Sequence, residues 1–186
     1  MSQAASAPPA GWVREVLDFW FSRTKEEWWR GSAAFDDEVR ERFAIEWARQ
    51  SRRVVDDFLG DADTALAAVI LFDQFPRNMF RGHADQYSTD HLALAVAKGA
   101  IERGYDDGMA PERRGFLYMP FQHSEALKDQ VQSLLLFTAL GDPEQLHYAR
   151  KHHEVIERFG RFPHRNAVLG RKPTAMERAA GEVVPW

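Results

Sequence analysis

Apolar residues at helical spacing run through most long segments of this chain of 186 residues. Val39, Phe43 and Trp47 stand four positions apart and form a single apolar stripe, which is typical of an amphipathic helix. A later segment opens at Asp142, which suits an N-cap, and closes at Gly160, which suits the residue after a helix. These apolar stripes and helix-end signals predict an all-α protein of about seven or eight helices.

The predicted helices are joined by short loops, which favour antiparallel helix hairpins in a compact array. One boundary is set by Pro76, before which the third helix is expected to end. Residues 115–121 read GFLYMPF and form a brief strand candidate, but Pro120 and the isolation of the segment count against it. The helical segments expected are 11–21, 35–51, 63–74, 88–104, 123–141, 142–160 and 173–180.

The composition indicates one ordinary globular domain over residues 11–186, preceded by a small, polar, flexible tail at 1–10. Because the chain has no cysteine, it cannot form disulfides or use thiol chemistry. A net charge of −4 and a pI of about 6.0 argue against a nucleic-acid binder. The longest apolar runs are too short to span a bilayer and the start lacks a signal peptide, so we expect a cytoplasmic protein without a membrane partner.

Three titratable side chains fall on the apolar faces of predicted helices. Asp73 lies at helical spacing from the apolar residues before it, and His152 from those after it. His123 joins the stripe of Leu127 and Val131 if the helix begins a few residues before it. A buried carboxylate needs a cation or hydrogen-bond donors, because leaving it unpaired costs roughly several kcal/mol.

A short phrase that ends in Arg-Asn is written twice, as FPRN at 75–78 and as FPHRN at 162–166. In each corner we expect the proline to end a helix and the phenylalanine before it to be extended. Next to the inward-facing groups these corners supply cations, namely Arg77, Arg161, His164 and Arg165. We therefore predict that the two corners lie close together and that Arg77 and Arg165 both reach the three inward-facing groups.

One carboxylate cannot balance several guanidinium groups and imidazoles, so this cluster is expected to carry surplus positive charge and to accept an anion. The chain has 19 arginines against 5 lysines, and Arg holds phosphate and carboxylate groups through paired hydrogen bonds. A GC-rich genome would give the same bias. A purely structural role, as a salt-bridge network that pins helix ends to loops, fits the same residues equally well.

Metal and nucleophile motifs are weak. Glu144 and His147 match the Glu-x-x-His element of di-iron bundles, but the match occurs once and lies on a charged face. A mononuclear site built from Asp73, His123 and His152 is conceivable, yet the arginines nearby oppose a cation, so we expect no metal and no cofactor. Ser124 is adjacent to His123 and is explained as a helix cap.

Three longer motifs, FDQFPRN, FLYMPFQHSE and RFGRFPHRNAVLGR, occur in this order. Together with VLDFWF and STDHLALAVA, they resemble the bacterial family catalogued as domain of unknown function nine-two-four, from about Val13 to Glu177. The resemblance implies an all-helical fold similar to tetratricopeptide arrays and implies no activity. The motif positions are Asp73, Gln74, Pro76, Arg77, Asn78, Tyr118, Pro120, His123, Ser124, Glu125, Arg161, Pro163, His164, Arg165, Asn166 and Arg171.

Three functions remain open. The first is a pocket for a small phosphate- or carboxylate-bearing molecule, with candidate ligand-binding residues Arg77, Asn78, Tyr118, Glu125, Arg161, Arg165, Asn166 and Arg171. If the pocket belongs to an enzyme, the catalytic candidates are His123, His152 and His164 as acid–base groups and Asp73 as an orienting group. The second function is a tetratricopeptide-like scaffold for a peptide or protein partner. The third is a purely structural network in a helical monomer or dimer.

Overall fold

The computed structural model describes residues 11–184, and the tail expected at 1–10 lies outside them. The described residues form helices, turns and loops without a strand, which confirms the all-α fold. The helices are α1 (Gly11–Phe21), α2 (Lys25–Arg30), α3 (Ala33–Gln50), α4 (Ala62–Val69), α5 (Phe75–Met79), α6 (Asp90–Glu102), α7 (Pro111–His123), α8 (Leu127–Leu140), α9 (Pro143–Phe159) and α10 (Ala175–Ala180). The predicted relation to tetratricopeptide arrays stays a prediction.

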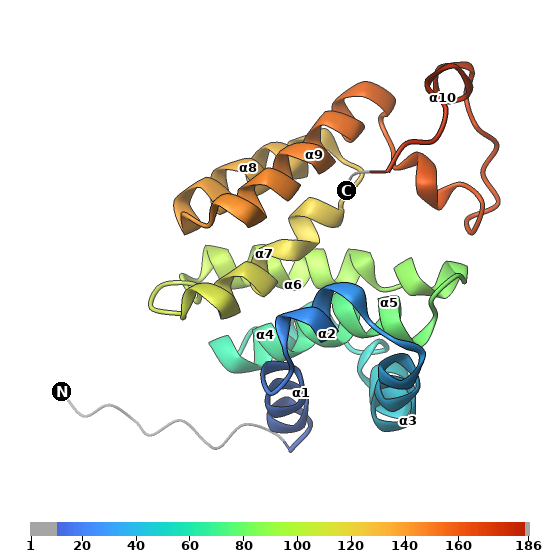
Figure 1. The fold of residues 1–186 in the computed structure, drawn as a ribbon. Coiled ribbons are helices and arrows are strands. Elements are labelled where there is room, and N and C mark those ends of the chain that lie inside the picture. The colour runs from blue at the N-terminus through green and yellow to red at the C-terminus, as the bar shows by residue number, and fades with distance from the viewer. Residues whose placement is uncertain (1–10, 185–186) are drawn as a thin grey trace.

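The helices stack in three levels (Figure 1). The N-terminal helices α1 to α5 form the lowest level, α6 and α7 cross above them, and the hairpin of α8 and α9 lies on top. Most buried apolar side chains, such as Trp20, Phe43 and Phe75, belong to one core between the lower levels. A small second core, with Phe162 at its centre, joins the end of α9 to the loop after it.

The helix expected to stop before Pro76 does not stop there. A π-helical turn, Ile70–Gln74, joins α4 to α5, and Phe75 is helical (φ −62°, ψ −39°) rather than extended. Proline removes one backbone donor, and the π turn absorbs the misfit between its ring and the preceding turn. The carbonyl of Phe72, to which an N–H at position 76 would donate in an α-helix, instead accepts a hydrogen bond from the hydroxyl of Thr89 (2.7 Å).

Two other carbonyls of the π turn are also bonded by side chains. Arg77 donates to the carbonyl of Asp73, and Asn78 donates to that of Gln74 (3.1 Å). The Arg and Asn of the FPRN phrase therefore serve the helix that contains them. These local contacts explain why a proline that usually ends a helix is tolerated inside this one.

The segment first considered as a strand belongs to α7, which contains Pro120 in its last turn. Pro111 opens this helix at a position where its missing N–H costs nothing. Gly115 lies against α9, where a Cβ would stand 2.6 Å from the flexible end of the Gln145 side chain, which would have to move.

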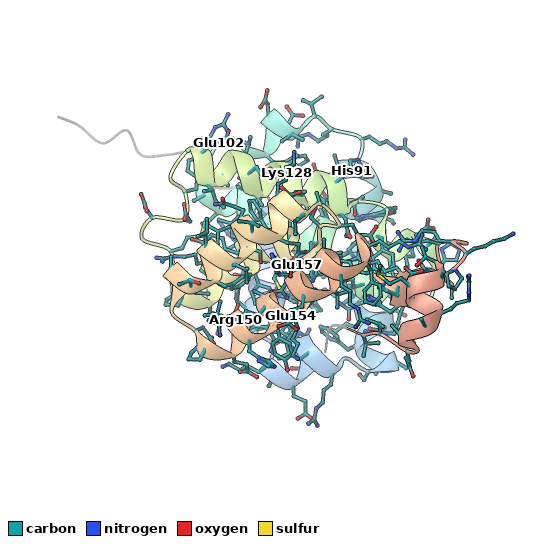
Figure 2. The ribbon with its side chains drawn as sticks, turned by 90° about the horizontal axis from the view of Figure 1, so that it is seen from above. His91, Glu102, Lys128, Arg150, Glu154 and Glu157 are labelled. Carbon is teal, nitrogen blue, oxygen red and sulfur yellow. The ribbon has the colours of Figure 1, made fainter. Side chains whose placement is uncertain are left out.

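The orientation of α8 also differs from the predicted one. The helix begins at Leu127, and His123 is the last residue of α7. Leu127 and Val131, expected to face inward, are 48% and 46% exposed, whereas Gln130 and Phe137 are completely buried. On the next helix the expected pattern is confirmed: His152 is buried, and Figure 2 shows Arg150, Glu154 and Glu157 on the outer side of α9.

Candidate functional site

A buried carboxylate and an imidazole form the centre of the site. Asp73 sits in the π turn with no exposed surface, and its two oxygens lie 2.7 and 3.0 Å from Nδ1 of His123 at the end of α7. Burial opposes ionisation of Asp73, but Arg77 and His123 outweigh it and hold its pKa at about 2. Burial, together with Arg77, lowers the pKa of His123. The pair is therefore a carboxylate and a neutral imidazole that donates its Nδ1–H, which leaves Nε2 as the basic nitrogen.

The two Phe-Pro corners meet at Asp90, in the first turn of α6. Arg77 donates to both oxygens of this carboxylate, at 2.8 and 3.0 Å. Arg165, from the second corner, lies 3.5 Å from Oδ2 of the same group and donates to the backbone carbonyl of His123 (3.0 Å). Arg77 also lies 3.3 Å from Asp73. The predicted convergence of the corners on Asp73 and His123 is thus present in the structure.

Arg165 occupies an unusual position for a guanidinium group. Its side chain is held between two aromatic rings, 4.4 Å from the ring centre of Tyr87 and 4.5 Å from that of Phe162. The residue is only 6% exposed, and its Nε has no hydrogen-bond partner among the described residues. Burial and the proximity of Arg77 lower the pKa of Arg165. The pKa of Arg77 itself is raised, because Asp73 and Asp90 outweigh its burial.

Two further histidines stand beside this arginine. His152 is buried in α9, its ring centre is 6.2 Å from that of His123, and its Nδ1 lies 2.8 Å from the carbonyl of Tyr148. Burial and the nearby His123 lower the pKa of His152 to about 3. His164 is half-buried, and burial and Arg165 lower its pKa to about 4. We call His123, His152, His164 and Arg165 the imidazole cluster.

A second set of ion pairs fastens the C-terminal loop. Arg171 donates to both oxygens of Glu125, at 2.7 and 3.0 Å, and Glu125 also accepts from the backbone N–H of Phe162. Arg161 donates to both oxygens of Glu177, at 2.7 and 2.8 Å. The amides and backbone of this loop complete the set: Asn166 donates to Glu177 and accepts from Arg171, and Arg171 reaches the carbonyl of Phe162.

The expected surplus of positive charge is wrong for the site as a whole. Four carboxylates pair with the four arginines of the two corners and their neighbours, in the pairs Arg77–Asp73, Arg77–Asp90, Arg165–Asp90, Arg161–Glu177 and Arg171–Glu125. A surplus was expected from the sequence because Asp73 was included as the one carboxylate that balances the positive charges. The three guanidinium groups other than Arg165 each make a two-pronged contact with a carboxylate, which leaves Arg165 as the weakly compensated one.

Two predicted ligand-binding residues lie away from the cluster. Asn78 accepts a hydrogen bond from Arg81 (3.2 Å), which in turn binds Asp36 of α3. Tyr118 donates to Asp106 in the loop before α7 (2.7 Å). Both residues join helices of the scaffold.

The sequence argument missed three contributors. Asp90 and Glu177 stand in the first turns of α6 and α10, where acidic side chains are common, and each also pairs with an arginine. Tyr87 gave no signal in its own segment, since a ring that stacks on a guanidinium group is identified only by its partner. Thr174 and Glu177 also form a capping box at the start of α10.

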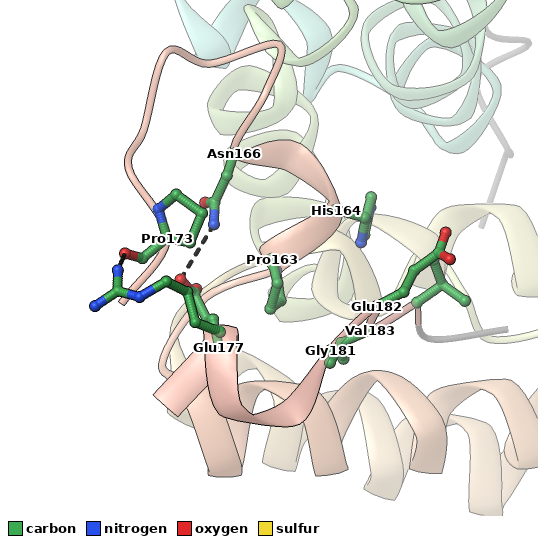
Figure 3. A pocket seen from close by; sticks show the side chains of 10 residues that line it. Pro163, His164, Asn166, Pro173, Glu177, Gly181, Glu182 and Val183 are labelled. Atoms are coloured by element: carbon green, nitrogen blue, oxygen red, sulfur yellow. Dashed lines mark hydrogen bonds between the residues drawn. The ribbon is translucent and has the colours of Figure 1, made fainter. Parts of the chain in front are cut away.

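A hollow of about 420 Å³ opens beside the second corner (Figure 3). Asn166 and Glu177 lie on one side of it and His164 on the other, with Pro163 between them. The last described residues, among them Glu182 and Val183, complete its wall. This hollow is the nearest described space through which a small molecule could approach His164.

The described residues hold no group of three or more His, Asp or Glu side chains placed to bind a metal ion. Between residues 11 and 184, no helix is both long and apolar enough to cross a membrane.

Comparison with known proteins places these residues in a family. A family model described as "Bacterial protein of unknown function (DUF924)" matches residues 16–180, which include both corners and the whole imidazole cluster. A solved structure of a protein of unknown function, ATU0120 from Agrobacterium tumefaciens, superposes with a TM-score of 0.84. It is 41% identical in sequence, and the match covers 90% of this chain and 95% of that one. Among curated proteins, none matches this chain. The chain therefore belongs to the DUF924 family of bacterial proteins of unknown function.

Proposed function

We propose that the protein binds a small phosphate- or carboxylate-bearing molecule at the imidazole cluster. The observation that carries this proposal is Arg165, a buried guanidinium group whose Nε has no hydrogen-bond partner among the described residues and whose pKa is lowered. A buried arginine with incomplete compensation is costly, and an anion that takes charge-assisted hydrogen bonds from it would remove that cost. The other arginines of the site already have such partners.

The histidines beside Arg165 support the same ligand class. Burial is the first cause of their lowered pKa values, and the arginines add to it: Arg77 acts on His123, and Arg165 acts on His152 and His164. A bound anion would reverse these interactions and raise all three pKa values. Binding should therefore take up protons and become tighter as the pH falls below about 6.5 toward 4.

The Asp73–His123 pair suits proton transfer to or from such a ligand. Asp73 fixes the ring orientation and the tautomer, because it accepts the Nδ1–H in a buried position. The neutral imidazole then has a basic Nε2, as a general base requires. We assign His123 as the acid–base group if a reaction occurs, with Asp73 as its positioning residue.

The hollow beside His164 offers a small ligand a place next to the imidazole cluster, of which it contains this one residue. Its volume of about 420 Å³ lies at the small end of the range for ligand sites. A peptide-binding scaffold, the alternative from sequence, needs a long open groove. The hollow of about 420 Å³ is lined by residues between 163 and 184, and a second one of about 300 Å³ by residues of α6, α7 and α8. Both volumes suit a small molecule better than a peptide.

The test is thermal unfolding of the full chain with inorganic phosphate, sulfate or citrate at several pH values. A ligand at a hundred times its Kd adds about 2.7 kcal/mol to the free energy of unfolding, or roughly 5–10 °C in Tm for a chain of this size. We expect at least one of these anions to raise the Tm of the wild type but not that of Arg165→Ala. Arg150→Ala, on the outer side of α9, is the matched control and should respond like the wild type.

Two results would contradict the proposal. One is that no anion raises the Tm of the wild type at any pH. The other is that Arg165→Ala, with its helix content intact by circular dichroism, responds as the wild type does. Citrate and phosphate serve as separate arms because they distinguish carboxylate from phosphate ligands.

A further inference from the structure

The outer face of α8 is apolar, unlike the outer faces of the helices around it. Leu127, Val131 and Leu135 are 48%, 46% and 61% exposed. The remaining exposed residues of this helix, all of which is described, are Lys128, Thr138 and Ala139. Thr138 turns its hydroxyl back to the carbonyl of Leu134 (2.6 Å), so Lys128 is the one charge on this face.

Neighbouring α9 shows what an ordinary solvated face looks like here. Its exposed positions are mostly charged, and they include Glu144, Arg150, Lys151, Glu154, Glu157 and Arg158. Single exposed apolar residues, such as Ile45 of α3 at 84%, are scattered on most protein surfaces and need no partner. A continuous apolar stripe along a helix differs from these, because such stripes mark surfaces that are buried against another helix.

The spacing of the stripe indicates what kind of surface covers it. The exposed residues Leu127, Val131, Leu135 and Thr138 follow one another at intervals of four, four and three residues. Residues at this spacing form a ridge along one side of a helix, and such ridges are the surfaces through which two helices pack side by side. A helix that carries the same pattern is therefore the best match, and α8 of a second copy carries it by identity.

We propose that two copies of this chain pair through α8, antiparallel about a two-fold axis between Val131 and Leu135. A two-fold interface uses the same patch on both copies, which suits a stripe that fits itself. The charges near its ends favour the antiparallel direction. Lys128 lies in the first turn of α8, and the acidic residue Glu144 follows the other end of the same helix. Antiparallel pairing brings the Lys128 of each copy toward the Glu144 end of the other.

The stripe forms the centre of this interface rather than the whole of it. A stable dimer buries about 800 Å² on each copy, which is more than a few half-exposed side chains provide. A hollow of about 300 Å³ lies beside the stripe between α6 and α8, with Ile101 and Phe121 among its lining residues. Figure 2 shows Lys128 between Glu102 of α6 and Glu157 of α9, so charged residues on both sides are available for the polar rim.

The first test measures the mass of the full chain in solution by light scattering and sedimentation equilibrium. We expect twice the 21.4 kDa of one chain at micromolar concentration. Val131→Asp places two carboxylates together at the axis, and such like-charge contacts cost several kcal/mol, so the dimer Kd should rise by more than about a hundredfold. Ile45→Asp, a matched change on exposed α3, should leave the dimer intact.

The second test probes the direction of pairing. Lys128→Glu and Glu144→Lys should each weaken the dimer, and the double variant should recover part of the loss. A wild-type protein that stays monomeric, or a dimer that survives Val131→Asp, would overturn the proposal, and a double variant without recovery would overturn the antiparallel arrangement. Leu135→Gln provides a milder change if Val131→Asp fails to fold. None of these residues touches Arg165, so this proposal and the anion site fail independently.

Discussion

The two corners share a phrase but not a structure. Around Pro76 the chain stays helical through a π turn, and Arg77 faces two carboxylates, Asp73 and Asp90. Around Pro163 the chain leaves α9 through a 3₁₀ turn, and Arg165 shares one carboxylate at longer range. The first corner is electrostatically complete, whereas the second holds a cation that its surroundings compensate poorly.

The difference shows that a motif fixes residue types but not their partners. The arginine after each proline points toward the same place, yet its role is decided by carboxylates from other helices. Where compensation is complete, the residue is explained by the fold. Where it is incomplete, a ligand is the simplest reason for the cost to persist.

Replacing the two arginines by alanine should show this contrast most strongly. Arg77→Ala leaves Asp73 buried without its main cation and should lower the free energy of unfolding by about 3–5 kcal/mol. Arg165→Ala removes a charge that is itself poorly compensated, so its loss should be smaller, about 1–2 kcal/mol, from packing between Tyr87 and Phe162 and from the bond to the carbonyl of His123. Chemical denaturation of both variants without added anions measures the two values.

The conservative variants control for packing. Arg77→Met and Arg165→Met keep most of the side-chain volume, so the gap between the two sites should persist if charge causes it. Equal losses at both sites would show that the corners are electrostatically alike and would remove the main argument for a ligand.

Much of the fold was predictable because its evidence is local. Apolar spacing and caps identified α3 and α9 directly. The course of the chain at Pro76 and Pro120 could not be predicted in this way, because the rules for proline describe its effect in an average helix. Here the Thr89 hydroxyl supplies a bond that the proline removes. That bond crosses 17 residues of sequence and has no local signal.

The site was predictable in place but not in charge. Helical faces correctly brought Asp73 and His152 inward, since orientation follows from periodicity. His123 also reaches the site, but as the last residue of α7 and not on the face of Leu127 and Val131, which points outward. The balancing residues, such as Asp90, could not be counted, because an acidic residue in the first turn of a helix has a sufficient local explanation. The outward direction of the apolar stripe of α8 was not predicted, for a related reason. Periodicity identifies an apolar face of a helix but does not identify what covers it.

A second difference between the corners is the group of imidazoles beside Arg165, and it should appear as a loss of folding stability at low pH. His152 is neutral when folded, with a pKa of about 3, whereas an unfolded histidine takes up a proton near pH 6.5. The unfolded state therefore binds more protons below pH 6.5, and stability falls as the pH drops from there toward 3. At pH 5 this group alone should cost the folded state about 2 kcal/mol relative to pH 7.5.

Urea unfolding of the wild type and His152→Gln across this range measures the effect. The variant should lose less stability on acidification, while His147→Gln, an exposed position on the same helix, should follow the wild type. Added phosphate should flatten the wild-type curve if an anion enters the imidazole cluster. Parallel curves for His152→Gln and the wild type would contradict the assigned protonation state.

The smallest expected effect concerns a hydrogen bond to a backbone carbonyl in the first corner. Thr89 donates to the carbonyl of Phe72 that Pro76 leaves without its helical donor, and the second corner has no such contact among the described residues. Thr89→Val should therefore cost about 1–2 kcal/mol, because it leaves a buried carbonyl unsatisfied, whereas Thr89→Ser keeps the hydroxyl and should cost less. In a Pro76→Ala background the new N–H can reach the carbonyl of Phe72, so the cost of Thr89→Val should shrink. A double-mutant cycle by urea unfolding measures this coupling, and additive losses would show that the hydroxyl does not replace the bond removed by the proline.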